Sequence, residues 1–584
     1  MAPKNDVLVL APLPDGSWMR LNLGGYRVDI QDMVQQLSAH RIIERLWKHD
    51  HTIWSPTPDE ISNRLGWLHC PEEMQTSLPE ISSVQHDLEQ DGIKNALLLG
   101  MGGSSLAPDL FSKMFPNKPN TIELFVLDST DPGAVFEMKE RLTPSKTVYI
   151  VSTKSGGTEE TLSFLKYFYQ QAVLALGSND AGNHFIAITD PGSKLLDLAQ
   201  KYRFRKTFLN DPNIGGRYSA LSHFGLVPAT ITGIDSDRLL ERAREIASLS
   251  SPDRPVHQNP AALLGVTLGK LATLGRDKLT FVNSPALDSF ADWAEQLIAE
   301  STGKEGKGIL PVVGEELGDP NDYGLDRVFV HLYLERDPDT EAPTLAAKLS
   351  ALTEAGHPII HIGLHDLYDI GGQFLLWEIA TAIAGYILQI NPFDQPNVEA
   401  AKVRAREMVA AYKASGALPA QTPILETDQF GIYSQIPANS MREALRLFLE
   451  NARPNDYIAI QSYLQPKPET TLALHRLQST LRSKTHLATT IGYGPRFLHS
   501  TGQLHKGDSG NGLFIILTNS PQKDIPIPDV NGSNSSMSFG ILKLAQALGD
   551  QMALADAGRR LIRLHLYNDP ITAIERIDQE IKAF

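Results

Sequence analysis

A short run of glycine and serine follows a strongly apolar segment near residue 100. In LLLGMGGSSLAPDLF, an apolar run ends at Gly100, and a helical pattern begins a few residues later. The turn between them contains Gly103, Ser104 and Ser105. Glycines let the backbone approach a phosphate, and free N–H groups and serine hydroxyls at a helix start can donate hydrogen bonds to it. The spacing is neither the dinucleotide-binding G-x-G-x-x-G pattern nor a P-loop. This stretch predicts an anion site, with an ordinary tight turn as the alternative.

A second hydroxyl-rich turn follows the apolar run TVYIVS, which ends at Ser152. Within VSTKSGGTEET, the side chains suited to an anion are those of Thr153, Lys154, Ser155 and Thr158. In the ordinary alternative, Glu159 and Glu160 are first-turn acids that complement a helix dipole. Ligands of an open parallel sheet bind outside the carboxyl ends of its strands, so two such turns on neighbouring strands predict one shared phosphate site.

The strands that hold these turns belong to a repeating pattern. Apolar runs alternate with amphipathic stretches along most of the chain, which predicts βαβ units and parallel sheets. Strands are expected to end at Gly100, Asp128, Ser152 and Thr189 in a first set, and at Asn283, Tyr333 and Gly363 in a second. Polar, proline-bearing segments at 250–260 and 415–423 predict linkers. The expected fold class is α/β, with two doubly wound parallel sheets, an N-terminal helical arm and a smaller C-terminal α/β unit. The expected boundaries are 1–65, 66–250, 260–412 and 424–584.

The composition is that of an ordinary globular protein with an acidic charge balance. The 584 residues are 42% hydrophobic and 21% charged, and the net charge is −15. This charge disfavours nucleic-acid binding, because the mean field repels a phosphate polymer. The single cysteine, Cys70, excludes an internal disulfide and a cysteine-based zinc site, and it favours a reducing compartment. We find no targeting segment and no apolar stretch near the ~18 residues of a membrane span, so we expect a cytoplasmic protein without a membrane partner.

Five motifs together resemble the glucose-6-phosphate isomerase family. They are GMGGSS, STKSGGTEET, NIGGRYSALSHFGL, ESTGKEGKG and NPFDQPNVEAAK, and the resemblance covers roughly residues 90–410. The wider chain looks most like the isomerase half of fused transaldolase and phosphoglucose isomerase proteins, without the transaldolase half. The resemblance implies two sugar-isomerase (SIS) subdomains. It also implies the reversible interconversion of glucose 6-phosphate and fructose 6-phosphate through a cis-enediol, in glycolysis and gluconeogenesis, without a metal or an organic cofactor.

The resemblance gives roles to the residues of the two turns. Ser104, Thr153, Ser155 and Thr158 are implied to hold the substrate phosphate, with Gly103 and Lys154 beside it. Hydroxyl and N–H groups suit this role, because they bind a dianion without a strongly positive surface.

Two further motifs hold the residues implied to act at the carbonyl carbons. NIGGRYS places Gly216 beside Arg217, whose guanidinium would stabilise the developing enediolate; such preorganised donors contribute roughly 3 to 4 kcal/mol in a transition state. Glu300, in QLIAESTGKEG, is the expected base that moves a proton between C1 and C2, for which one carboxylate suffices. Taken without the resemblance, Arg217 also fits a surface arginine after a turn, and Glu300 also fits an i,i+4 pair with Lys304.

The motif NPFDQPNVEAAK predicts the start of a helix after a proline-rich entry. By the resemblance, Lys402 assists ring opening, and Gln395 binds a sugar hydroxyl or orients its neighbours. The ordinary alternative for a lone helical lysine is a solvated surface charge.

The ring-opening histidine of the family is the motif that departs from the family order. It normally lies between the glutamate and lysine motifs, where this chain has GKGILPVVGEELGDPNDYG, without a histidine. FLHSTGQLHKG, at residues 497–507, resembles the missing segment. We therefore assign the role to His499, with His505 as the weaker rival, and interpret His331 as a residue inside a strand. The family usually takes this histidine from a neighbouring subunit, which implies a homodimer as one alternative; the sequence does not distinguish cis from trans.

The expected catalytic set is Glu300, Arg217, Lys402 and His499, acting on a hexose 6-phosphate. Two alternatives stay open at this point. One is a non-catalytic phosphosugar-binding regulator built on the same subdomains, which needs only the phosphate turns. The other is a bifunctional phosphoglucose and phosphomannose isomerase, because no motif reports epimer preference. No motif reports association with a separate transaldolase either.

Overall fold

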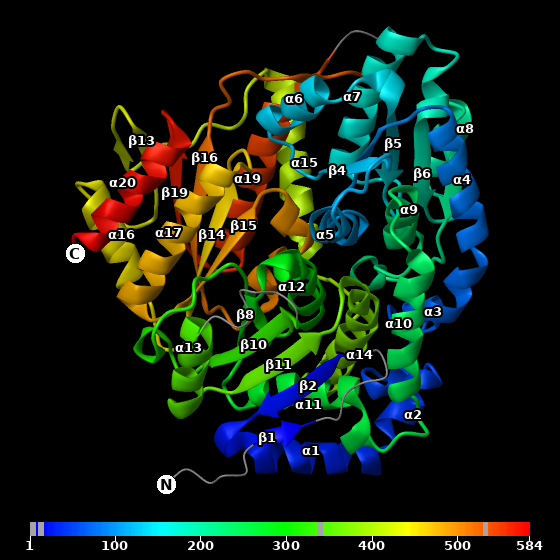
Figure 1. Ribbon diagram of the computed structural model, residues 1–584. Coiled ribbons are helices and arrows are strands. Elements are labelled where there is room, and N and C mark those ends of the chain that lie inside the picture. The colour runs from blue at the N-terminus through cyan, green and yellow to red at the C-terminus, as the bar shows by residue number, and fades with distance from the viewer. Residues whose placement is uncertain (1–6, 10–16, 336–342, 530–534) are drawn as a thin grey trace.

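The structure is a computed structural model that describes residues 7–9, 17–335, 343–529 and 535–584. It contains three large sheets and one two-stranded sheet. The large sheets surround a common centre at which α5 (Leu106–Met114) and α12 (Asp288–Thr302) lie (Figure 1). The expected α/β class with parallel sheets is confirmed.

The first sheet is entirely parallel and has the strand order β4-β3-β5-β6-β7. Its strands are β3 (Asn95–Leu99), β4 (Glu123–Leu127), β5 (Thr147–Ser152), β6 (Phe185–Thr189) and β7 (Lys206–Leu209). The helices around it include α4 (Leu78–Gln90), α6 (Pro132–Arg141), α7 (Glu159–Leu176), α8 (Lys194–Lys201) and α9 (His223–Ile231). Leu99 packs in one apolar cluster with α7, whereas Leu98 packs in another with α4 and α9. Burial on both faces explains the nearly continuous apolar strands.

The strand order of the first sheet reverses between β3 and β5. In an open α/β sheet, the crevice beside such a reversal, at the carboxyl ends of the strands, is the usual ligand position. The turns at Gly103 and at Thr153 follow β3 and β5 directly. Topology therefore places both hydroxyl-rich turns at one switch point.

The second sheet has the strand order β1-β2-β11-β10-β8-β9. Its strands are β1 (Val7–Val9), β2 (Trp18–Asn22), β8 (Lys278–Asn283), β9 (Leu310–Val312), β10 (Arg327–Leu334) and β11 (Ile359–Leu364). Strands β8 to β11 are parallel, whereas β2 runs antiparallel to β11. Val330 packs with α11 (Pro260–Thr273) and α14 (Ile370–Leu388), while Phe329 packs with α13 (Pro343–Glu354) on the opposite face.

Helix α14 is the apolar centre of the second subdomain. Among the described residues, Leu367–Leu388 is the one segment long and apolar enough to cross a membrane, although no such stretch was expected from the sequence. In the fold, 94% of its apolar window is buried. It packs against α11 and α10 (Ser236–Leu249). We therefore assign it as a core helix.

The third sheet has the order β12-β13-β19-β16-β14-β15. Its strands are β12 (Leu425–Glu426), β13 (Phe430–Tyr433), β14 (Tyr457–Tyr463), β15 (Ala488–Tyr493), β16 (Gly512–Asn519) and β19 (Arg560–Leu566). One face carries α16 (Met441–Leu449), α17 (Pro468–Thr485) and α20 (Pro570–Lys582). The other face packs with α19 (Phe539–Asp556) and with β9 of the second sheet. The small sheet pairs β17 (Pro526–Ile527) with β18 (Met537–Ser538).

The N-terminal part packs on the second subdomain. It contains α1 (Arg27–Ala39) and α2 (Ile42–Trp47), and Ile42, Ile43 and Leu46 are buried in the core there. It also supplies β1 and β2, which the sequence did not indicate, because β2 is short and buries only Met19 and Leu21. We propose the division at 1–65, 66–250, 260–412 and 424–584. The parallel strands of each large sheet come from one of the last three ranges.

The expected strand ends agree closely with the structure. Those at Ser152, Thr189 and Asn283 coincide with the ends of β5, β6 and β8, and those at Gly100, Asp128, Tyr333 and Gly363 lie one residue from the ends of β3, β4, β10 and β11.

Helix α15 (Val398–Ser415), which carries Lys402, lies along α19. The two helices approach closely at Gly549, where an added Cβ would lie 2.6 Å from the backbone nitrogen of Ala405. Gly549→Ala should therefore lower the free energy of unfolding by about 1 to 3 kcal/mol, the usual cost of overpacking. Helix propensity alone predicts the opposite sign, a gain of roughly 0.8 to 1.0 kcal/mol.

The measurement is the apparent melting temperature in a calorimetric scan. Gly25→Ala is the matched control, because no atom lies within 4 Å of the Cβ that it adds. An unchanged or higher melting temperature for Gly549→Ala would contradict the close packing of α15 on α19.

Candidate active site

The first hydroxyl-rich turn is a short helix, Gly102–Ser104, between β3 and α5. Gly102 has a φ of +54°, which suits glycine. A Cβ on Gly103 would lie 2.0 Å from the carbonyl oxygen of Gly216, so only glycine allows these two backbones to approach. Ser104 is buried, and its carbonyl accepts a hydrogen bond from Ser152 Oγ at 3.2 Å. The turn is therefore held against both β5 and the loop of Arg217.

The second turn lies beside the first and precedes α7. The hydroxyls of Thr153 and Thr158 lie 3.0 Å apart, and Ser155 Oγ accepts a hydrogen bond from the N–H of Gly157 at 3.3 Å. Lys154 turns toward Asp190, with which it forms an ion pair, and it also donates to the carbonyl of Pro212 at 2.9 Å. Hydroxyls and the start of a helix thus face the switch point, while the lysine charge is paired at one side.

Arg217 joins the first subdomain to the second. It lies in the short helix Gly216–Tyr218, and its side chain is 2% exposed. Its Nε donates to Ser301 Oγ at 2.7 Å, and its Nη1 donates to Gln395 Oε1 at 2.9 Å. Its Nη2 donates to the carbonyls of Pro392 and Asp394 at 2.7 and 2.9 Å. This guanidinium is therefore a rigid buried cation rather than a surface charge.

Glu300 lies on the last turn of α12 and faces Arg217, with 3.5 Å between Oε1 and Nη1. One turn earlier, Gln296 Nε2 donates to Glu300 Oε2 at 3.1 Å. Lys304 does not pair with Glu300 at hydrogen-bond distance; its Nζ lies 2.7 Å from Asp394 Oδ1. Burial, with a contribution from the Arg217 charge, lowers the pKa of Lys304 to about 8.

His499 comes from the C-terminal unit of the same chain and lies over the first turn. It ends the short helix η14 (Arg496–His499), and a Cβ on Gly102 would lie 2.9 Å from His499 Cβ. Its backbone carbonyl accepts a hydrogen bond from Gln296 Nε2 at 2.6 Å. Its Nε2 lies 3.1 Å from Glu160 Oε1. One chain therefore brings this imidazole, Glu300 and both turns together.

Glu160 is a site residue for which the sequence suggested only a helix-capping role. It is buried on the first turn of α7 and also accepts a hydrogen bond from Gln546 Nε2 at 2.6 Å. Burial alone would raise the pKa of the Glu160 carboxyl, but the charges of His499 and Lys402 hold that pKa below its usual value. The signal in the sequence is its place two residues after Thr158, on a helix that starts at the second hydroxyl-rich turn.

The remaining predicted residues differ in how firmly they are held. Gln395 is fixed by Arg217, as described above. Lys402, on the first turns of α15, has a side chain that is 48% exposed, and its Nζ lies 4.0 Å from Glu399 Oε2. Its charge contributes, after that of His499, to the lowered pKa of Glu160.

The two other histidines have different surroundings. His505 is buried in the C-terminal unit, 3.0 Å from the hydroxyl of Tyr457, and burial lowers its pKa. His331 lies in β10 beside His361, with 3.2 Å between their Nδ1 atoms. Of the three histidines considered from the sequence, His499 is the one that faces the turns.

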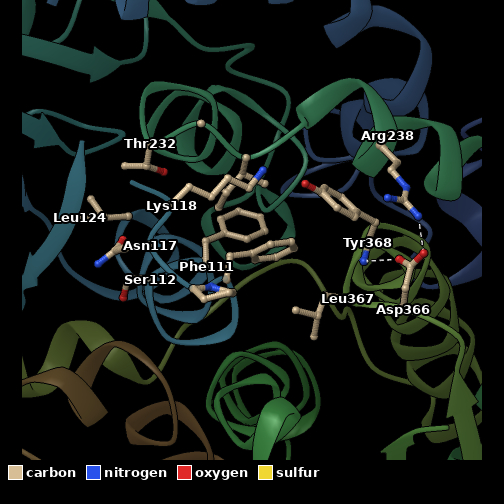
Figure 2. Close-up of a pocket in the computed structure, with 14 residues that line it drawn as sticks. Phe111, Ser112, Asn117, Lys118, Leu124, Thr232, Arg238, Asp366, Leu367 and Tyr368 are labelled. Atoms are coloured by element: carbon tan, nitrogen blue, oxygen red, sulfur yellow. Dashed lines mark hydrogen bonds and ion pairs between the residues drawn. The ribbon is translucent and has the colours of Figure 1, made fainter. Parts of the chain in front are cut away.

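A separate hollow of about 310 Å³ lies beyond the far end of α5. Figure 2 shows Phe111 and Tyr368 lining it, with Arg238 paired to Asp366 at its edge. It contains none of the residues of the candidate site. Among the described residues, no group of three or more histidine, cysteine, aspartate or glutamate side chains is arranged to hold a metal ion.

Comparisons with known proteins identify the family. The family model for phosphoglucose isomerase matches residues 72–309, which include both turns, Arg217 and Glu300. Glucose-6-phosphate isomerase of Carboxydothermus hydrogenoformans is 30% identical over 391 residues, which are 58% of this chain and 83% of that protein. The enzyme of the same name from Thermus thermophilus is 28% identical over 393 residues, 60% of this chain and 91% of that protein.

Two solved structures share the fold. A hypothetical protein of Thermus thermophilus superposes with a TM-score of 0.56 at 25% identity, covering 67% of this chain and all of that one. A glucose-6-phosphate isomerase of Chlamydia trachomatis superposes with a TM-score of 0.57 at 19% identity, covering 69% of this chain and 90% of that one. The sequence match and the shared fold together place this chain in the glucose-6-phosphate isomerase family.

Proposed function

We propose that this chain catalyses the reversible interconversion of glucose 6-phosphate and fructose 6-phosphate through a cis-enediol. The family assignment supports this reaction. The observation that carries the proposal is the Glu300 carboxylate held 3.5 Å from the buried Arg217 guanidinium. A phosphosugar sensor needs only the two hydroxyl turns, whereas a carboxylate beside a rigid cation is what proton transfer next to a carbonyl requires. This pair favours an enzyme over a regulator.

The substrate phosphate binds between the two turns. The hydroxyls of Thr153, Ser155 and Thr158, together with Ser104, surround this position, and the N-terminus of α7 adds its backbone N–H groups. Gly103 allows the backbone of the first turn to approach that of Gly216. Lys154 is already paired with Asp190, so it supports the turn from its side.

Ring opening uses His499 and Lys402. His499 donates a proton to the ring oxygen as the bond between C1 and that oxygen breaks, and the C1 hydroxyl passes its proton to solvent water as it becomes a carbonyl. Glu160 orients the imidazole, because its carboxylate lies 3.1 Å from Nε2. Lys402 places a second positive charge where the leaving oxygen develops negative charge.

Isomerisation uses Glu300 and Arg217. Glu300 removes the proton from C2 of the open aldose and returns it to C1, while the proton of the C2 hydroxyl passes to the C1 oxygen. The same carboxylate runs the reverse reaction. Arg217 stabilises the enediolate oxygen that forms between these steps; such a preorganised donor is worth roughly 3 to 4 kcal/mol. Every step uses a side chain of this chain, so we expect activity in the presence of EDTA. We place the enzyme in the cytoplasm, where the buried free thiol of Cys70 stays reduced.

Glu300→Gln should lower kcat by about 10² to 10⁴, because it removes the proton carrier but keeps the shape of the side chain. The measurement follows glucose 6-phosphate formation from fructose 6-phosphate in EDTA with a coupled dehydrogenase. Binding of 6-phosphogluconate, an acyclic sugar-acid phosphate, should be retained, since the phosphate turns are intact. Glu305→Gln, at an exposed position in the same loop, is the control. Unchanged turnover of the Glu300 variant would remove this residue from the mechanism.

His499→Ala should slow turnover of the cyclic substrate more than turnover of an open-chain one. The open-chain probe is 5-deoxyfructose 6-phosphate, which lacks the hydroxyl that closes the ring. We expect a loss of about 10² or more with fructose 6-phosphate, the usual share of a positioned acid. Exchange of the C1 proton of the probe for deuterium, followed by NMR, should change little. His486→Asn alters an exposed histidine of the same unit as a control. Equal losses on both substrates would reject ring opening as the role of His499.

Glu300→Gln and His499→Ala should fail to complement each other, because the site draws both residues from one chain. The two variants are co-expressed or mixed and then assayed with fructose 6-phosphate. In a second experiment, the specific activity of the unmodified protein is followed on dilution, which would separate subunits. A site shared between subunits would restore a fraction of activity in mixed dimers. Restored activity would therefore establish that His499 acts in trans.

A further inference from the structure

The segment that carries His499 has a second charged residue, Arg496, at the start of the same short helix. Its Nη2 donates to Asp109 Oδ2 at 2.8 Å and lies 3.9 Å from Asp292 Oδ2. Its Nε lies 3.4 Å from Asp128 Oδ2. One guanidinium from the C-terminal unit therefore reaches three carboxylates of the other two subdomains.

Each of these carboxylates lies on an element that holds part of the site. Asp109 lies on α5, the helix that follows the first phosphate turn. Asp292 lies on α12, about two turns before Glu300. Asp128 directly follows β4 and accepts a hydrogen bond from Ser105 Oγ at 3.2 Å. Arg496 therefore contacts the supports of both the phosphate turn and the catalytic carboxylate.

A short path of contacts leads from Arg496 back to the histidine. Ser105 Oγ, which donates to Asp128, also lies within hydrogen-bond distance of the Gly102 carbonyl at 3.2 Å. Gly102 in turn lies against the His499 side chain, since a Cβ added to Gly102 would lie 2.9 Å from His499 Cβ. The path links Arg496, Asp128, Ser105, Gly102 and His499, so the phosphate turn and the imidazole share one set of supports.

The charges of this cluster make Arg496 difficult to replace. The side chains of Asp109 and Asp128 are each 12% exposed, and Lys113 is a second cation paired with Asp109. Burial alone would raise the pKa of Asp109, but Arg496 and Lys113 hold that pKa below its usual value. Without Arg496, Asp109 would keep Lys113 as a cationic partner, whereas Asp128 would lose the ion pair that offsets its burial. The planar guanidinium reaches several carboxylates at once, whereas an ammonium is a point charge.

We propose that Arg496 is a positioning residue that docks the histidine segment onto the phosphate turn and α12, so that the His499 imidazole reaches the ring oxygen of the sugar. The expected effect of Arg496 on turnover rests on the proposed function, whereas its docking role does not. Arg496 itself contacts carboxylates of the protein. Two neighbouring contacts hold the segment farther along: Ser500 Oγ lies 3.2 Å from Glu295 Oε1, and Gln503 Nε2 donates to the Gly303 carbonyl at 2.9 Å. They keep the segment folded onto α12 but do not reach the phosphate turn.

The test compares Arg496→Ala with the unmodified protein on a cyclic and an open-chain substrate. We expect kcat with fructose 6-phosphate to fall about 10²-fold, the cost of displacing a catalytic group by about 1 Å, with KM nearly unchanged. Deuterium exchange at C1 of 5-deoxyfructose 6-phosphate should change little, because Glu300 and Arg217 stay in place. A merely structural defect would lower both rates together. Equal losses on the two substrates, or full turnover of the cyclic one, would overturn the proposal.

Two variants and an added cation sharpen the comparison. Arg560→Ala removes another arginine of the C-terminal unit, whose Nη1 lies 2.6 Å from Asp456 Oδ2, and it should leave the ratio of the two rates unchanged. Arg496→Lys should recover only part of the lost turnover, because lysine keeps the positive charge but lacks the planar set of N–H donors that reaches several carboxylates. Added guanidinium ion should raise turnover of Arg496→Ala and leave Arg560→Ala unaffected. Failure of both forms of rescue would contradict a positioning role.

A measurement without substrate separates this inference from the proposed function. Hydrogen exchange of the peptide covering residues 494–507 should become faster in Arg496→Ala but not in Arg560→Ala. If the unmodified protein does not isomerise fructose 6-phosphate, the proposed function fails, while faster exchange would still establish docking by Arg496. If it isomerises the sugar and the peptide exchanges at the same rate in both variants, the docking role fails.

Discussion

The site depends on one buried guanidinium. Arg217 belongs to the first subdomain, yet its nitrogens are held by Ser301, Gln395 and the carbonyls of Pro392 and Asp394, all from the second. A buried cation is tolerated only when its donors are satisfied, so the two subdomains have one favourable relative placement. That placement puts Gly216 against the first phosphate turn and Arg217 beside Glu300. The geometry that we propose for phosphate binding and for enediolate stabilisation therefore follows from the same set of hydrogen bonds.

The C-terminal unit adds His499 to the residues that the first two subdomains bring together. Residues from one face of its sheet and from α19 pack with β9, and the same unit carries the short helix that ends at His499. Gln296, one turn before Glu300 on α12, contacts both the Glu300 carboxylate and the His499 carbonyl. The segment that we propose for ring opening thus stands late in the chain, whereas the family order puts it between Glu300 and Lys402. Spatial order, not chain order, determines which side chains lie together at the candidate site.

Local features of the chain were predictable because they need only neighbouring residues. An apolar run followed by glycine and hydroxyl residues identifies a strand and its turn, and the predicted ends of β5, β6 and β8 coincide with the structure. The short strand β2 was not predictable, because its strand conformation depends on pairing with β11, which lies far along the chain. The ion-pair partners of buried or half-buried lysines were equally unpredictable from the sequence. Lys154 pairs with Asp190 and Lys304 pairs with Asp394, although each has a nearer acid along the chain, because folding brings those carboxylates into contact. From the sequence, Glu160 could be read only as a helix-capping residue, because its partner His499 lies 339 positions away along the chain.

The sequence by itself determined the α/β class and the two hydroxyl-rich turns, and it supplied the side chains that we propose for an aldose–ketose isomerisation, because these depend on residue type and short-range spacing. Only the tertiary structure decided which of three histidines faces the turns, that His499 lies near Glu300 within the same chain, and how loosely Lys402 is held. Those outcomes depend on contacts between segments hundreds of residues apart, and such contacts are set by the packing of whole sheets and by the pairing of buried charges such as Arg217 and Arg496.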